Sequence, residues 1–244
     1  MKKTPKLLIL AGTVLAFLFL FGIIFYNNFI KKSIYEENSQ HLLSTYEQVD
    51  KTFTMFVQHN WNALSDWSNN LQYLDDAENM KTLWYEFARR KDAWQYQDFY
   101  MFNENCDFIT AAGRDGNAPN IQGIFLDMYE TGQPVISSYI ASDSNRRIVF
   151  ALPMDVPYTI NGITYSGLAV SYNNDVVEKL IAGNIYQGQS DCYILTSDGN
   201  VLLSLEPKTE FLQKISNLFD FLNKYTNMTE TEITDLKKNI KNVS

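Results

Sequence analysis

A small number of side chains in this 244-residue chain have types that suit the binding of a small molecule. Arg114 lies in a loop with Gly113 and Gly116, where its guanidinium is able to hold a carboxylate through two parallel hydrogen bonds. Tyr139 and Tyr172 are able to stack on a ligand and to donate their hydroxyl groups to it. The alternatives are that Arg114 is a solvated loop charge and that the tyrosines belong to the core of a sheet.

The sequence lacks the motifs of catalysis and of metal binding. Its two histidines, His41 and His59, both fall in a long helical segment, and no His-Glu-x-x-His, Gly-x-Ser-x-Gly or phosphate-loop motif occurs. Asn103, Asn105 and Asp107 alternate as in a calcium loop, but the central Gly and terminal Glu of such a loop are missing. We therefore expect a polar hairpin turn there, and neither a catalytic site, a metal site nor a cofactor.

Charge and cysteine content argue against two further classes of protein. The chain has 20 Lys and Arg against 28 Asp and Glu, a net charge of −8, and its basic residues form no stripe. Because nucleic-acid binding depends on neutralising phosphates, we expect no nucleic-acid partner. Cys106 and Cys192 are the only cysteines, too few for the disulfide framework of small secreted proteins, and the sequence leaves open whether they pair.

The segment from Leu7 to Ile30 contains no charged residue and is flanked by lysines on both sides. At about 1.5 Å per residue, a helix from Leu7 to Tyr26 covers the roughly 30 Å hydrocarbon core of a lipid bilayer. The segment is longer than the apolar region of a cleaved signal peptide, about 7–15 residues, and its bulky exit lacks a small-residue cleavage site. We therefore expect an uncleaved signal-anchor, with cleavage as the alternative. The lysine bias favours an extracytoplasmic position for the residues after about 31.

The residues after this segment have the spacing of helices. Residues 33–74 contain no Gly or Pro, and their larger apolar side chains recur mostly at intervals of three and four. This spacing predicts one long amphipathic helix, or two nearly collinear ones, and we expect a homodimer through it. A second helix is predicted over residues 77–90, where one face carries Met80, Leu83, Trp84 and Phe87.

The pattern then changes to short β-like segments separated by turn residues. Residues 98–102 and 108–110 flank a polar stretch and predict a β-hairpin. A short helix is predicted over 125–130, stopped by Gly132. The elements predicted after it are strands at 135–141, 147–152 and 166–172, a connection between the last two through Pro153, Pro157 and Asn161-Gly162, and a helix at 175–182 that ends at Gly183.

The hairpin at 98–110 recurs later in the chain. Residues 191–203 have the same order of Asp, one residue, Tyr and two apolar residues, then five turn residues and three largely apolar ones. This self-similarity predicts an internal repeat. Helical spacing follows at 211–225 and again at 230–241, but no counterpart of the three strands follows. We therefore expect an incomplete second unit that belongs to a longer protein, with a remnant second unit as the alternative.

This order of elements resembles a double Cache domain, the PAS-like sensory region of bacterial receptors, over about residues 33–205. The fold class that the resemblance implies is α+β: an N-terminal transmembrane helix, a long amphipathic helix, a PAS-like antiparallel sheet and the start of a second PAS-like unit. The segments that carry the resemblance are the hairpin Asp98 to Thr110, the strand ending Phe150-Ala151-Leu152-Pro153-Met154, the strand Gly167-Leu168-Ala169-Val170, and Asp191-Cys192-Tyr193-Ile194-Leu195 with Asp198-Gly199 at its turn.

The resemblance implies ligand sensing, usually in the membrane-distal unit, here about residues 92–175. Amino-acid-binding members of the family use an Arg-x-Trp motif and an Asp near the end of the last distal strand. Between Arg114 and Ser138 no Arg-x-Trp occurs, and Ser171 stands where the Asp would fall, which argues against an amino-acid ligand. The polar and aromatic residues of the implied pocket, between the distal sheet and the segments that cross it, are Tyr100, Arg114, Ser137, Tyr139, Arg147, Tyr165 and Tyr172.

Together with the apolar segment, the resemblance implies the extracytoplasmic ligand-sensing region of a membrane-bound bacterial signalling receptor. Relatives carry histidine kinase, diguanylate cyclase or chemoreceptor outputs, and this sequence contains the signature of none of them. The competing hypotheses are a membrane-anchored binding or scaffold protein without catalytic output, and an anchored surface enzyme. The expected domains are a cytoplasmic N-terminus (1–6), a transmembrane signal-anchor (7–30), stalk and dimerisation helices (31–91), a membrane-distal PAS-like Cache unit (92–187) and an incomplete membrane-proximal PAS-like unit (188–244).

Overall fold

A computed structural model describes residues 4–71, 73, 85–86, 88–89, 91, 95–110, 112–118, 122–181, 192–205 and 215–241. Side chains are described for these residues except 4–18, 20, 24, 122, 192, 205 and 241. The chain divides into two compact units, Met1–Lys51 and Thr52–Ser244. The finer division into domains that the sequence suggests stays a prediction.

Helix α1 (Thr4–Leu71) forms where the sequence predicts a long helix. The absence of Gly and Pro between residues 33 and 71 lets its backbone hydrogen bonds continue without a break, and the predicted long helix is confirmed. Among the residues that the structure describes, no helix combines the length and apolarity that crossing a membrane requires. Most side chains of the predicted membrane span, Leu7 to Tyr26, are outside the described residues. Most residues of the helix predicted at 77–90 are also outside them.

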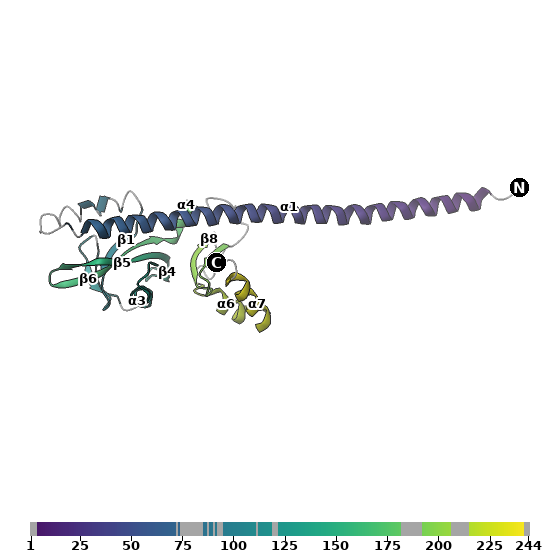
Figure 1. Ribbon diagram of the computed structural model, residues 1–244. Helices are drawn as coiled ribbons and strands as arrows, with labels where there is room; N and C mark the ends of the chain where they lie inside the picture. Colours follow the sequence, from purple (N-terminus) through teal and green to yellow (C-terminus); the bar gives the residue numbers. More distant parts are fainter. Residues whose placement is uncertain are drawn as a thin grey trace. The chain divides into compact units, whose positions relative to one another are not determined.

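The second unit, Thr52–Ser244, contains an antiparallel sheet, of which Figure 1 labels β1, β4, β5 and β6. Its described strands follow the order β3-β2-β1-β6-β5-β4. The predicted hairpin at 98–110 is confirmed by the pairing of β1 with β2. β6, far along the chain, lies on the other side of β1 and brings Ser171 opposite Asp98. The strands are β1 (Asp98–Phe102), β2 (Asp107–Thr110), β3 (Asp115–Asn117), β4 (Val135–Ile140), β5 (Arg146–Ile160) and β6 (Ile163–Asn173).

The predicted connection between the last two strands is wrong, because both strands continue through it. β5 runs on through Pro153 and Pro157, and the chain turns only at Asn161-Gly162. β4 pairs with β5 only as far as Ala151, so both prolines lie where β5 has one neighbour, and the register shifts beyond Pro153. A proline has no backbone N–H to donate to a neighbouring strand, but at a free edge or a bulge no neighbouring strand requires that hydrogen bond. The Gly-rich loop predicted after β2 likewise contains a short strand, β3.

Each face of the sheet packs against a helix. Residues 52–71 of α1 cover one face, where the Phe56 ring lies 5.4 Å from that of Phe150 and 5.1 Å from that of Tyr172. Helix α3 (Gln122–Thr131) covers the other, where Phe102 stacks on Phe125 with ring centroids 3.7 Å apart. Successive strand residues point to opposite faces, so both faces contribute to the core. The predicted stop of α3 is confirmed at Gly132, which has a φ of +64°.

A second hairpin follows the sheet, as the sequence repeat predicts. It pairs β7 (Cys192–Leu195) with β8 (Val201–Leu205). The helix predicted at 175–182 is confirmed as α4 (Asn174–Ile181), which contacts β8. Of the segment predicted as a helix at 211–225, α6 (Leu218–Tyr225) is described, and α7 (Glu230–Lys241) follows it.

Candidate functional site

A cavity of about 380 Å³ lies on the face of the sheet that α3 covers. Asp98 and Tyr100 line it from β1, and as alternate residues of one strand they point to the same face. Tyr139 lines it from β4 and Phe125 from α3. Its walls come from separate segments of the chain, so only the folded sheet creates it. The remaining lining residues are Phe108 and Thr110 of β2, with Arg114, Asp115 and Ala118.

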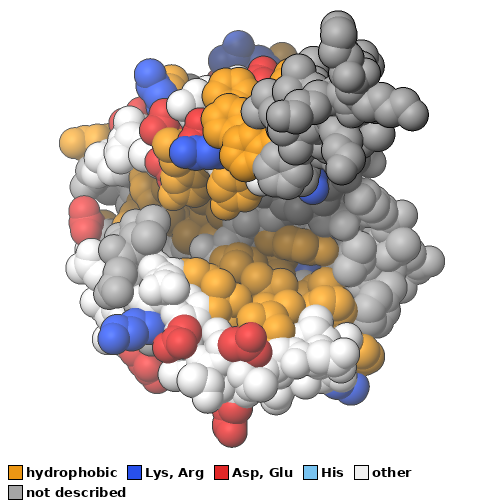
Figure 2. Space-filling model, turned by 90° about the vertical axis from the view of Figure 1, so that its right-hand side faces the viewer, with side chains coloured by type: hydrophobic (Ala, Val, Ile, Leu, Met, Phe, Trp, Pro, Cys, Tyr) orange, Lys and Arg blue, Asp and Glu red, His pale blue; other side chains and the backbone are white. Residues whose placement is uncertain are grey.

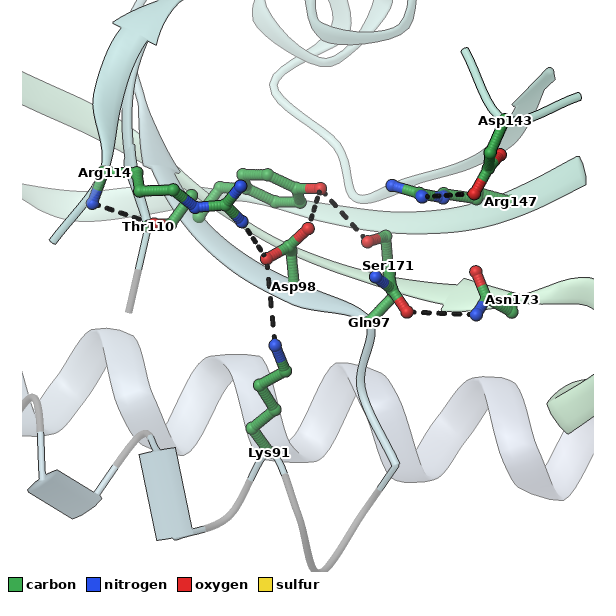
Figure 3. A network of polar contacts seen from close by, with 10 residues as sticks. Lys91, Gln97, Asp98, Thr110, Arg114, Asp143, Arg147, Ser171 and Asn173 are labelled. Carbon is green, nitrogen blue, oxygen red and sulfur yellow. Dashed lines mark hydrogen bonds and ion pairs between the residues drawn. The ribbon is translucent and has the colours of Figure 1, made fainter. Parts of the chain in front are cut away.

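The Asp98 carboxylate is a largely buried charge, with 11% of its side chain exposed. Arg114 Nη2 donates to Asp98 Oδ1 at 2.9 Å, and Lys91 Nζ lies 4.0 Å from the same oxygen (Figure 3). Such partners are needed because an unpaired charge is costly to remove from water. Arg114 and Lys91 are themselves 67% and 38% exposed, so a ligand that brings its own hydrogen-bond donors is able to replace them at the carboxylate.

Tyr100 connects this carboxylate to the central strand β6. Its hydroxyl donates to Asp98 Oδ2 at 3.4 Å and lies 3.2 Å from Ser171 Oγ, which is directly opposite Asp98 in the sheet. Burial, followed by the nearby Tyr139 hydroxyl, raises the pKa of Tyr100 well above its ordinary value of 10.0. The hydroxyl therefore keeps its proton at neutral pH and is a hydrogen-bond donor.

Arg147 supplies a third cation near the cavity, and this one is largely buried. Its Nη2 lies 3.0 Å from Asp143 Oδ2, its side chain is 17% exposed, and its strand position is directly opposite Tyr139. Burial lowers the pKa of Arg147, but hydrogen bonding to Tyr139 and Asp143 more than offsets this and raises it. Tyr139 is thus held by a charged partner on the neighbouring strand.

The structure brings three of the seven predicted binding residues into one cavity: Tyr100, Arg114 and Tyr139. Arg147 stands next to them through its bond to Tyr139. Ser137 lines a neighbouring cavity of about 370 Å³ between β4 and the β7–β8 turn. The participation of these residues in binding stays a prediction.

The last two predicted residues do not line the cavity. Tyr165 is buried on the face of β6 that α3 covers, and burial and then the charge of Asp115, which does line the cavity, raise its pKa. Tyr172 points to the opposite face, where its hydroxyl donates to Asn60 Oδ1 of α1 at 2.8 Å. The position of Tyr172 therefore matches the alternative that this tyrosine belongs to the core of the sheet.

Sequence reasoning missed Asp98 as a lining residue of the cavity, and it missed Lys91 and Ser171 as the residues that contact Asp98 and Tyr100. The sequence does hold a signal for Asp98: an acid and Tyr100 alternate with Phe99 and Met101 in a strand, which places the acid and the tyrosine on one face. No comparable signal marks Lys91, because it belongs to a different segment. The Cys106 thiol, whose pairing the sequence left open, is free and buried.

The chemistry of the cavity is that of polar recognition. Asp98 is able to accept hydrogen bonds from a ligand, and Arg114 is able to donate them once it leaves the carboxylate. Within the described part of the chain, no group of three His, Cys, Asp or Glu side chains is placed to hold a metal. On the face drawn in Figure 2, the described Lys and Arg side chains lie apart, among acidic and uncharged ones.

Solved structures of sensory domains share this fold, and two of them illustrate the similarity. One is the ligand-binding domain of the Pseudomonas aeruginosa PAO1 amino acid chemoreceptor PctB in complex with L-Arg, at a TM-score of 0.55 and 14% identity, covering 77% of this chain and 72% of that one. The other is the sensor domain of the V. cholerae histidine kinase DctB, at a TM-score of 0.50 and 12% identity, covering 85% and 76%. No protein-family model and no curated protein matches the sequence. The fold is thus the double Cache type that the sequence predicts, a long N-terminal helix with an antiparallel sheet.

Proposed function

We propose that this chain is the extracytoplasmic ligand-sensing region of a membrane-bound bacterial signalling receptor and that it binds a small molecule in the Asp98 cavity. The observation that carries the proposal is the buried Asp98 carboxylate, which is held by two cations from exposed positions. A ligand gains affinity by taking over these bonds. The two fold neighbours, a chemoreceptor domain bound to L-Arg and a histidine kinase sensor domain, support the same kind of function.

The proposal includes the membrane anchor and the dimer that the sequence predicts. The apolar segment from Leu7 to Tyr26 would cross the lipid bilayer, and the domain after it would lie outside the cytoplasm. The α1 residues that follow expose large apolar side chains, including Tyr35, Leu42 and Tyr46, which a second copy would cover in a homodimer. The chain itself would not be catalytic, and its output would be a histidine kinase or diguanylate cyclase module elsewhere in the receptor.

Adjacent residues of β6 provide a route from the cavity to the helix. Ser171 faces Tyr100 in the cavity, whereas Tyr172 faces α1 and bonds to Asn60. Asn60 is fully buried and also donates to the Phe56 carbonyl at 2.8 Å, so this polar pair fixes the height of α1 on the sheet. A ligand would act by binding one position of β6 more tightly than another, since only differential affinity shifts such a balance.

A thermal-shift screen of the full chain in detergent micelles against small polar metabolites tests the proposal. A ligand at 100 times its Kd adds about 2.7 kcal/mol to the stability of the native state, which a melting curve resolves. We expect compounds that raise the Tm of the wild type but not of Asp98→Asn. The matched control is Asp175→Asn, which removes an exposed carboxylate paired with Lys179 and should respond like the wild type. A screen without binders, or binders that ignore Asp98→Asn, would contradict a binding role for this cavity.

A further inference from the structure

Arg146 joins the sheet to the second hairpin through a buried guanidinium. Its side chain is 5% exposed, and its Nη1 donates to the Val201 carbonyl at 2.7 Å and to Ser138 Oγ at 2.8 Å. Its Nη2 donates to the Ile215 carbonyl, and the Ser138 hydroxyl also donates to the Val201 carbonyl. Two strands of the sheet therefore hold two carbonyls that belong to the second hairpin and to the segment leading into α6.

The two carbonyls mark one small piece of backbone. Val201 is the first residue of β8, directly before an irregularity in the β7–β8 register, and its N–H donates to the Ser216 carbonyl at 2.9 Å. Ile215 immediately precedes Ser216. One guanidinium thus fixes the start of β8 and the approach to α6 together. Burial lowers the pKa of Arg146 to about 10, so the group remains charged at neutral pH.

The same two strands also face the ligand cavity. Ser138 and Arg146 each precede a residue of the cavity region, Tyr139 on β4 and Arg147 on β5, and these two are directly opposite each other in the register. Because neighbouring strand residues point to opposite faces, each strand presents one side chain toward the cavity and the next toward the second hairpin. The β4–β5 hairpin is therefore shared between both sites.

We infer that Ser138 and Arg146 form a latch through which the β4–β5 hairpin transmits the state of the Asp98 cavity to the second hairpin. In the docked state, the latch holds the Val201 and Ile215 carbonyls as observed. In the released state, Arg146 leaves these carbonyls and they become hydrated. The inference rests on the proposed function, because it assigns the cavity a state to transmit. It uses no ligand contact, so it can be tested without knowing the ligand.

The test is a mutant cycle on the full chain in lipid nanodiscs, read by hydrogen exchange of residues 201–205 and 218–225. Arg146→Gln should raise exchange in both segments about tenfold, because buried carbonyls lose a charged donor, while the β1 and β6 amides stay protected. Tyr139→Phe removes the hydroxyl that binds Arg147 on the cavity side, and it should change exchange of residues 201–205 about fivefold. In the double variant, the Tyr139→Phe effect on this segment should disappear.

Controls separate transmission from a merely structural role. Arg89→Gln removes an exposed arginine paired with Glu86 and should leave both segments unchanged. Additive effects in the double variant, or a Tyr139→Phe variant with unaltered exchange at residues 201–205, would overturn the inference. If Arg146→Gln unfolds the chain, Ser138→Ala replaces it in the cycle with the same expected result. The thermal-shift screen can fail while this cycle succeeds, so the two proposals are separable.

Discussion

The β1–β2 and β7–β8 hairpins have the same type of turn, but the residues that surround the turn differ. In the first, the Asn103 N–H donates to the Asp107 carbonyl and the Cys106 N–H to the Asn103 carbonyl. In the second, Thr196 and Asn200 make the first of these bonds, and Gly199 donates to Thr196. The donor at the fourth turn position has a positive φ in both, +59° at Cys106 and +82° at Gly199. This is a type I turn followed by a left-handed residue.

An asparagine from a later segment closes each turn in the same way. Asn117 Nδ2 donates to the Asn105 carbonyl and to Asp107 Oδ1, at 2.7 and 3.0 Å. Asn217 Nδ2 donates to the equivalent Asp198 carbonyl and Asn200 Oδ1, both at 3.0 Å. The internal repeat therefore extends to the hydrogen bonds of the turn.

The left-handed position is filled in opposite ways. In the first hairpin, the Cys106 side chain itself enters the core beneath α3. In the second, Gly199 has no side chain, and the Phe219 ring of α6 lies against its Cα. The repeat therefore preserves the hydrogen bonds of the turn, whereas each hairpin fills the core beside it from a different direction. The ligand cavity lies outside the repeated turn, where strands β1, β2 and β4 meet helix α3.

The largest expected effect on stability comes from replacing the left-handed residue of each turn by alanine. Gly199→Ala should cost about 4 kcal/mol of unfolding free energy, because it strains a left-handed backbone and drives a methyl group into the Phe219 ring. Cys106→Ala should cost only about 1 kcal/mol, since that backbone already carries a side chain. Urea titration of the full chain in detergent micelles measures both. Similar losses of unfolding free energy in the two variants would contradict the view that the two hairpins fill this position in opposite ways.

The contacts that attach the six-stranded sheet and the second hairpin to their neighbours provide the next contrast. Asn60→Leu should cost about 2 kcal/mol, because the buried Tyr172 hydroxyl loses its acceptor on α1. The loss should appear as faster hydrogen exchange in β5 and β6, not in β7 and β8, which Arg146 attaches separately. Tyr172→Phe is the control that removes the donor and should affect the same strands. Uniform loosening of all four strands would contradict separate attachment.

The fold was predictable where local patterns decide it. The apolar spacing after residue 33 predicts α1, and turn residues around 103–107 and 196–200 predict both hairpins. The course of β5 through Pro153 was not predictable. A proline is tolerated there because the pairing of β5 with β4 stops at Ala151. That is a fact of strand pairing, and no single segment contains it.

The candidate site was predictable only in part for the same reason. Tyr100, Arg114 and Tyr139 have side-chain types that suit binding, and they do meet in the cavity. Asp98 appeared only as the first residue of a strand, because its partners Arg114 and Lys91 come from other segments. Residue type suggests what a side chain can do, but the sheet decides which side chains meet.

The closing asparagines should differ by a smaller amount. Asn217→Ala should cost about 1.5 kcal/mol, because Asn217 Oδ1 also caps α6 by accepting from the Phe219 and Asp220 N–H groups. Asn117→Ala should cost about 0.5 kcal/mol, since Asn117 is exposed and makes only the turn bonds. Thermal unfolding of both variants beside the wild type decides the order. A larger loss at Asn117 would show that the cap is not what distinguishes the turns.

The smallest expected effect is a pH dependence of stability that is confined to helix α7. The Thr229 backbone N–H and then its hydroxyl donate to the Glu232 carboxylate at the start of α7, and these bonds lower the Glu232 pKa below its ordinary value of 4.5. A lowered folded-state pKa means that the stabilisation is present above 4.5 and is lost as pH falls through the folded-state value. The first turn of α3 has no acidic residue, so α3 should not respond. An NMR titration should therefore show α7 resonances moving with Glu232, and Glu232→Gln, which still caps the helix, should remove this movement. Glu230→Gln is the matched control, and an α7 titration that persists in Glu232→Gln would assign the effect to another group.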